Sequence, residues 1–307
     1  MSKGTNLISE IGKYFKENDA TSAMNKIMKI IRTLNFSEKR LFGEESRCNC
    51  KYSQLQVLQL LLLFPCFMIK NAFNYSTSSL CGIADCGKDV FYRFLSREDY
   101  DWRNILINIT TQLWRKTLAN TERDDKTPIC LMVDDTDYPK RGIQTEMIGK
   151  VFSHVEHKMI LGFKGLFLGI TDGATQMLMD FCLVGERGKN GMYNLKQKQL
   201  DARFTKERDK DSHTAKRIKE YDESKITLMI EMIKRLIARK IHFEYILADS
   251  VISNFAPSKN SKVESSLMNK VLPIKRCSYL CIKQTNKAYE HRNKTEFHRE
   301  TRYVVQS

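Results

Sequence analysis

The stretch Leu131-Met132-Val133-Asp134-Asp135-Thr136 determines how the second half of this chain is interpreted. A short β-prone run, Ile129 to Val133, ends there in two acids and a small hydroxyl residue. A later stretch, Tyr245-Ile246-Leu247-Ala248-Asp249-Ser250, has the same design. An acid after a strand is often a cap or turn residue. Open α/β sheets, however, place their chemistry at the carboxyl ends of strands, so adjacent strands would bring Asp134 and Asp249 to one Mg²⁺.

The pattern between these two stretches predicts an α/β domain over residues 128–255. Residues 165–171 and 176–184 are apolar strands joined by the turn signal Asp172-Gly173, and residues 224–239 have the apolar spacing of a packed helix. A polar segment, 186–220, carries eleven Lys or Arg against six acids and is either a surface that follows DNA or a charged loop. Strand, hairpin, helix and strand together indicate a central sheet that receives a crossover helix.

The first 120 residues predict a helical DNA-binding domain. The expected helices span residues 21–34, 53–69, 77–83, 88–95 and 100–118. The third and fourth of these, with Cys86-Gly87 between them, resemble a helix-turn-helix that would present Lys88 and Arg93 to a DNA groove. Helical bundles without nucleic acid carry the same hairpin, so both interpretations stay open.

Composition favours a polyanionic partner. The chain has 307 residues, with 51 Lys and Arg against 36 Asp and Glu, a formal net charge of +15. Such a surface attracts nucleic acid, whereas the 42% share of hydrophobic residues disfavours a disordered chain. The longest apolar stretch, residues 55–69, falls short of a membrane span, and residues 1–20 show no secretory signal. Nine irregularly spaced cysteines fit reduced thiols, so we expect a cytoplasmic protein with no membrane partner.

Several separated motifs resemble the DDE transposases of bacterial insertion sequences, and within them the IS-four-like group. They are Val-Asp-Asp-Thr-Asp-Tyr-Pro-Lys-Arg-Gly (133–142), Val-Phe-Ser-His-Val-Glu-His-Lys (151–158), Gly-Phe-Lys-Gly-Leu-Phe-Leu-Gly (162–169), Thr-Asp-Gly (171–173) and Ile-Leu-Ala-Asp-Ser (246–250). The likeness covers roughly residues 50 to 255. It implies an α/β fold, an RNase H-like mixed sheet with flanking helices, after an all-helical N-terminal domain. It also implies metal-dependent cleavage and strand transfer at element ends.

The resemblance also implies a set of site residues. The family motif of Asp, any residue and Thr places the first catalytic, metal-binding aspartate at Asp134, with Asp135 as the competing register, and the second at Asp249. The implied cofactor is Mg²⁺ or Mn²⁺. The implied partners are double-stranded DNA, both element ends and target, and a possible second copy of the chain, in a nucleoid-associated bacterial protein. Lys140 and Arg141, beside the first acids, could hold a phosphate or could be solvated turn residues.

The third acid of the family is the weak point of the resemblance. The family carries a glutamate on a helix after the last sheet strand, yet only Glu264, Glu290, Glu296 and Glu300 follow Asp249, and residues 284–300 are almost wholly polar. Glu290 has a spacing that some DDE enzymes use. We therefore expect residues 256–307 to be an irregular or degenerate tail. The alternative function is a truncated, catalytically inactive transposase that acts only as a DNA-binding remnant, so whether the chain is an enzyme stays open.

Overall fold

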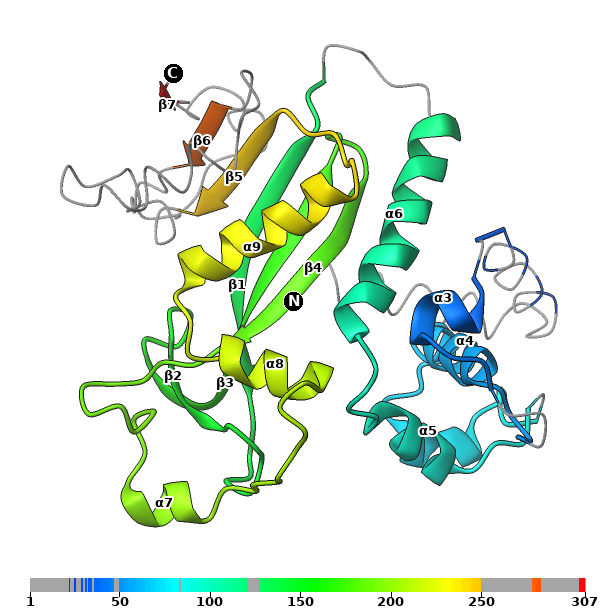
Figure 1. Cartoon of the computed structure of the whole chain (residues 1–307), viewed down its shortest axis with the longest axis horizontal. Coiled ribbons are helices and arrows are strands. Elements are labelled where there is room, and N and C mark those ends of the chain that lie inside the picture. The colour runs from blue at the N-terminus through cyan, green and yellow to red at the C-terminus, as the bar shows by residue number, and fades with distance from the viewer. Residues whose placement is uncertain are drawn as a thin grey trace, which may run out of the picture. The chain divides into compact units, whose positions relative to one another are not determined.

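The computed structural model divides the chain into two compact units, Met1–Leu113 and Trp114–Ser307 (Figure 1). It describes residues 36–46, 50–82, 84–120 and 127–249, the strand segments 278–282 and 304–306, and a few single positions before residue 36. No helix within these residues is long and apolar enough to cross a membrane.

The described part of the first unit is helical. Its elements are α3 (Glu38–Phe42), α4 (Gln54–Leu63), the 3₁₀ helix η1 (Ala72–Thr77), α5 (Lys88–Leu95) and the first part of α6 (Trp102–Asn120), which continues into the second unit. A capping box of Ser53 and Gln56 starts α4. The core of this unit contains a cluster of buried rings, among them Phe64, Tyr75 and Phe91.

Two of the expected helices differ from the structure. The helix expected at 77–83 is wrong: the short helix is η1, and residues 78–82 form turns and bends. The helix expected to reach residue 69 ends at Leu63, because Pro65, after the C-cap residue Phe64, has no backbone N–H with which to continue the helical hydrogen bonds. By contrast, α5 spans the residues predicted for it.

The second unit is built on a mixed sheet, which has seven strands in the described residues. The strands are β1 (Cys130–Pro139), β2 (Gly149–Ser153), β3 (Lys158–Thr171), β4 (Gln176–Val184), β5 (Tyr245–Asp249), β6 (Ser278–Ile282) and β7 (Val304–Gln306). Their order is β2-β3-β1-β5-β6-β7, and β4 also pairs with β3. β3 is antiparallel to β1, β2 and β4, whereas β1, β5 and β6 are mutually parallel neighbours. β6 and β7 fall within the expected tail, where no strand was predicted.

Three helices of the second unit follow the hairpin strands in sequence: α7 (Gln197–Asp201), α8 (His213–Glu220) and α9 (Lys225–Ala238). Of these, α8 packs against β4, and α9 crosses the sheet along β3 and β4 (Figure 1). The N-cap Ser224 accepts a hydrogen bond from the backbone N–H of Thr227 and starts α9. Leu228, Met232 and Leu236 are buried, as are Leu131 and Leu166 on the strands. The predicted fold class, a mixed sheet with flanking helices after a helical N-terminal region, is confirmed.

A buried ion pair fastens α9 to the edge strand β4. The side chain of Asp180 is completely buried, and its Oδ2 lies 2.7 Å from Nε of Arg235, whose side chain is 31% exposed. A buried charge without its partner costs several kcal/mol, because the protein interior does not solvate it as water does. The pair therefore requires α9 to lie over β4 in one register.

Asp180→Ala should lower the free energy of unfolding by about 3 kcal/mol, the lower end of the range for broken buried pairs, since Arg235 keeps some contact with water. Urea unfolding of the purified chain measures the change. Lys234→Ala is the matched control, because Lys234 pairs with Glu231 on the exposed side of the same helix and should change stability by no more than about 0.5 kcal/mol. Equal effects of the two variants would contradict the structural role of the buried pair.

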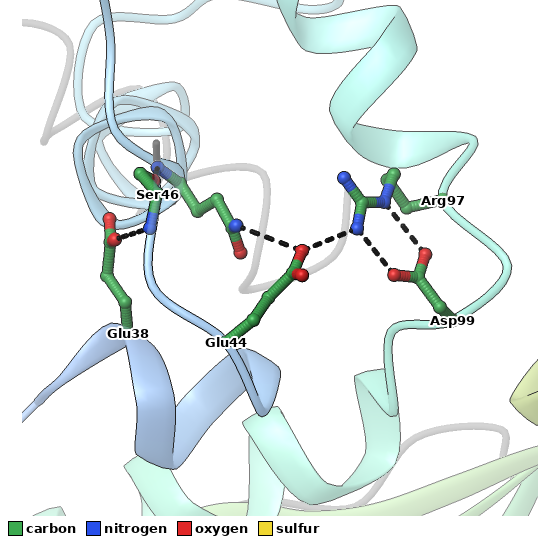
Figure 2. Close-up of polar contacts among 6 residues, drawn as sticks. Glu38, Glu44, Ser46, Arg97 and Asp99 are labelled. Carbon is green, nitrogen blue, oxygen red and sulfur yellow. Dashed lines mark hydrogen bonds and ion pairs between the residues drawn. The ribbon is translucent and has the colours of Figure 1, made fainter. Parts of the chain in front are cut away.

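A polar network fixes the loop between α3 and α4 (Figure 2). Carboxylate oxygens of Glu38 accept hydrogen bonds from the backbone N–H groups of Ser46, at 2.6 Å, and Leu55, at 2.9 Å. Burial of this carboxylate works against its ionisation, yet the hydrogen bonds from Leu55 and Ser46 together outweigh burial and lower the pKa of Glu38 below its ordinary value of 4.5. The ionised form of Glu38 therefore stabilises the fold.

This shift predicts the pH dependence of stability. Because the pKa of Glu38 is lower in the folded state, its contribution is fully present above pH 4.5 and is lost as the pH falls through the folded value. Glu38→Gln should be less stable than the native chain at pH 7 and should lose less stability on acidification below 4.5. Urea unfolding across this pH range is the measurement. The exposed Glu45→Gln serves as the control, and a native-like acid profile for Glu38→Gln would refute the assignment.

Candidate active site

The strand register places Asp134 and Asp249 at the same level of two neighbouring strands. β1 and β5 are parallel, and their last paired positions are Val133 and Ala248. Asp134 follows the first and Asp249 the second, so each aspartate is one residue beyond the last pair. Parallel strands at this register are about 4.8 Å apart. The backbone positions of the two predicted metal-binding residues are therefore adjacent.

The acids of β1 alternate between the two faces of the sheet. β1 continues beyond the predicted strand to Pro139, paired with β3 throughout. Successive side chains of a strand point to opposite faces, so Asp135 and Asp137 share the face of the buried Val133, and Asp134 and Thr136 share the other. The two candidate registers for the first aspartate thus lie on opposite faces of the sheet.

Asp135 is engaged by a lysine. Lys225, the first residue of α9, forms an ion pair with Oδ2 of Asp135. The side chains are only 16% and 25% exposed, so water screens the pair weakly. A cation already occupies this carboxylate, which makes it a poor ligand for a metal ion.

Asp137 lies close to a second lysine, Lys164. Nζ of Lys164 lies 3.4 Å from Asp137 and 3.6 Å from Glu186, and it donates to the carbonyl of Phe152 at 2.8 Å. The Lys164 side chain is only 1% exposed, and three oxygen partners compensate for its burial. This lysine therefore connects the ends of three strands and has a structural role.

Asp134 is the more exposed of the two candidate residues. The residue is exposed, and its Oδ1 accepts a hydrogen bond from the backbone N–H of Asp135 at 2.8 Å. Its position is level with Asp249 on β5. Mg²⁺ keeps several water ligands and typically binds to one or two carboxylates. The donor chemistry at Asp134, with a second aspartate at the same level of the neighbouring strand, fits a hard divalent cation.

Within the part of the chain that the structure describes, no three His, Cys, Asp or Glu side chains lie close enough to hold a metal ion. The four glutamates after Asp249 that the sequence offered as candidates, including Glu290, lie outside the described residues.

The structure separates Lys140 and Arg141 from the first acids. Both are exposed, but they follow the end of β1, six residues beyond Asp134. Six extended residues span about 20 Å, so these cations do not lie beside the acid pair as the sequence suggested. His154 and His157 lie in the turn between β2 and β3, both exposed.

In the first unit, α5 presents two of the predicted DNA-binding cations. Lys88 and Arg93 are exposed; Nζ of Lys88 lies 5.2 Å from the centre of the Phe73 ring, and Nε of Arg93 donates to the carbonyl of Asp89. Arg97, by contrast, is held by Glu44 and Asp99 (Figure 2). Two cations on α5 therefore remain available to a partner.

Sequence reasoning missed the two lysines that neutralise acids of β1. The burial of Lys164 could have been predicted, because a single lysine inside the apolar stretch Gly-Phe-Lys-Gly-Leu-Phe indicates a buried cation that needs acidic partners. The pairing of Lys225 could not have been predicted from a local pattern, since its partner Asp135 is 90 residues away in the chain.

Comparison with known proteins agrees with this geometry. The mixed sheet with flanking helices is consistent with an RNase H-like domain. The family model described as DDE superfamily endonuclease matches residues 77–256, more than half of the chain. The chain therefore belongs to the DDE superfamily endonucleases, which act on DNA and generally use divalent metal ions. Neither a curated protein nor a solved structure matches it significantly.

Proposed function

We propose that this chain is the transposase of a bacterial insertion sequence, in the IS-four-like group, and that it cleaves and transfers DNA strands at the ends of its element. The observation that carries the proposal is the register of β1 and β5, which puts Asp134 and Asp249 at the same level, one residue beyond the last pair of these two parallel strands. The family match and the net charge of +15 both support DNA as the substrate.

Asp134 and Asp249 would hold Mg²⁺ or Mn²⁺, whose chemistry here is charge neutralisation at the scissile phosphate and activation of the attacking hydroxyl. Asp134 is favoured over Asp135 because Lys225 already neutralises Asp135 from the α9 face. Asp134 accepts a hydrogen bond from the backbone N–H of Asp135. The ion pair between Asp135 and Lys225 holds Asp135 in place and thereby orients the Asp134 side chain. In this scheme Asp135 is a positioning residue.

The assignment predicts different outcomes for two adjacent aspartates. Asp134→Asn should reduce nicking of DNA that carries the element ends, in Mg²⁺ or Mn²⁺, by more than about 100-fold, since losing a ligand exceeds the 10–100-fold cost of outer-shell changes. Asp249→Asn should do the same. Asp135→Asn retains a hydrogen-bond acceptor for Lys225 and should stay within about tenfold of the native rate. Gel analysis of nicked and joined products is the measurement.

The outcomes separate the alternatives. Loss of nicking in Asp135→Asn but not in Asp134→Asn would move the ligand to Asp135 and contradict our assignment. A native chain that binds element ends without nicking them in either metal would support the rival function, a DNA-binding remnant of a transposase. Cleavage that is indifferent to the element ends would instead indicate a nuclease of another kind.

We also propose that α5 contributes to double-stranded DNA binding through Lys88 and Arg93. The double variant Lys88→Gln/Arg93→Gln should weaken duplex binding and reduce the slope of log affinity against log salt by about 1.8, close to 0.9 per lost phosphate contact. Lys39→Gln/Arg40→Gln is the matched control, because these exposed cations on α3 give the same change in net charge. Equal slopes for the two double variants would contradict a specific role of α5.

Three further expectations belong to the same proposal. DNA transposition requires access to the chromosome, so we place the protein in the bacterial cytoplasm at the nucleoid. Two element ends must be brought together, which fits a homodimer. The domain division that we propose is a helical DNA-binding region over 1–120, a catalytic region over 128–255 and a remaining segment, 256–307.

A further inference from the structure

A cleft of about 310 Å³ opens in the second unit, away from the acids of β1 in sequence. Its walls come from the segment between β1 and β2, from the loop after α7 and from α8. The apolar part of the lining is formed by Met147, Ala215 and Ile218, with Phe204. The cleft lies in the basic segment 186–220, for which the catalytic proposal has no role.

Charges are sorted around this cleft. Lys206, Arg208 and Lys210 line it, whereas the acids that alternate with them in the sequence, Glu207, Asp209 and Asp211, do not. Lys219 of α8 also lines the cleft. The stretch 206–211 is neutral as a whole, yet the side that faces the cleft is cationic. This arrangement favours an anionic ligand.

Two arginines hold the loop that forms the cleft. Arg208 binds the only acid in the lining, Glu146, through both guanidinium NH groups, and its side chain is only 10% exposed. Arg203 donates to the carbonyl of Ile148 at 3.3 Å and lies 5.3 Å from the centre of the Tyr193 ring. Within the described residues, the buried Nε of Arg203 has no hydrogen-bond partner. Arg203 and Arg208 therefore fasten the loop after α7 to the segment between β1 and β2.

Two lysines and the aromatic ring of the cleft are open to solvent. Phe204 is 53% exposed, which is unusual for a residue of this size that could bury its ring. Lys210 and Lys219 are exposed, and neither forms an ion pair with a carboxylate of the described chain. An exposed ring beside an apolar floor, with cations at the rim, combines a stacking surface with phosphate contacts.

We propose that this cleft binds an unpaired nucleotide of a single-stranded DNA segment. The base stacks on Phe204 and covers the apolar floor, and the flanking phosphates contact Lys210 and Lys219. Duplex DNA would use the cations alone, because its paired bases cannot reach an apolar cleft without leaving the stack. The inference rests on the proposed DNA substrate and adds a preference for unpaired strands.

Fluorescence anisotropy in EDTA, where no cleavage occurs, tests the preference. The probes are a blunt duplex, the same duplex with a single-stranded thymidine extension, and that extension with abasic nucleotides. The native chain should prefer the thymidine extension by about fivefold or more, since stacking of one base contributes about 1–3 kcal/mol. Abasic nucleotides, which keep the phosphates, should remove most of the preference. Phe204→Ala should remove it too, and Phe204→Trp should retain it.

Charge variants test the rim of the cleft. Lys210→Gln/Lys219→Gln should weaken binding to the thymidine extension several-fold and lower its salt dependence. Lys189→Gln/Lys198→Gln, in the same basic segment but outside the cleft lining, changes the net charge equally and should keep the preference. An unchanged preference in Phe204→Ala, or equal losses in the two double variants, overturns the inference. A chain that nicks DNA without preferring the extension overturns this inference alone, whereas a chain that binds none of the probes overturns the proposed function as well.

Discussion

The parallel pairing of β1 with β5 is the constraint on which the candidate site depends. Parallel neighbours cannot be joined by a tight turn, so the chain must return to the starting edge of the sheet through a crossover. Helix α9 makes this return, and its buried face and the pair of Arg235 with Asp180 set its position over β4. Because the crossover sets the level at which β5 enters the sheet, it also sets Asp249 beside Asp134.

The same packing sorts the acids of β1 by function. Three aspartates within four residues would repel one another if they were all left unpaired. Lysines on the α9 face neutralise two of them: Lys225 pairs with Asp135, and Lys164 with Asp137. Asp134, on the other face, keeps an exposed carboxylate. A structural requirement of the fold therefore separates the acid that can bind a cation from the acids that hold the sheet together.

Local patterns predicted much of this fold. The strand β4 and the helices α5 and α9 follow the apolar periodicity of their sequences, because each buries one continuous face. The length of β1 was underestimated, since its second half is polar and receives its stability from pairing with β3. Because β1 extends to Pro139, Lys140 lies about six extended residues from Asp134. The partners of Asp135 and Asp137 depend on contacts distant in sequence, which no local pattern specifies.

Net charge predicted a polyanionic partner but did not indicate where such a partner could bind. The segment 186–220 has a cationic excess, yet lysines and acids alternate where it forms the cleft, so counting charges along residues 206–211 gives zero. Only the fold separates the two signs, with cations toward the cleft and acids away from it. A polyanion is then attracted to one side of the loop and repelled by the other. This asymmetry gives the approaching strand an orientation, which a uniformly basic loop could not provide.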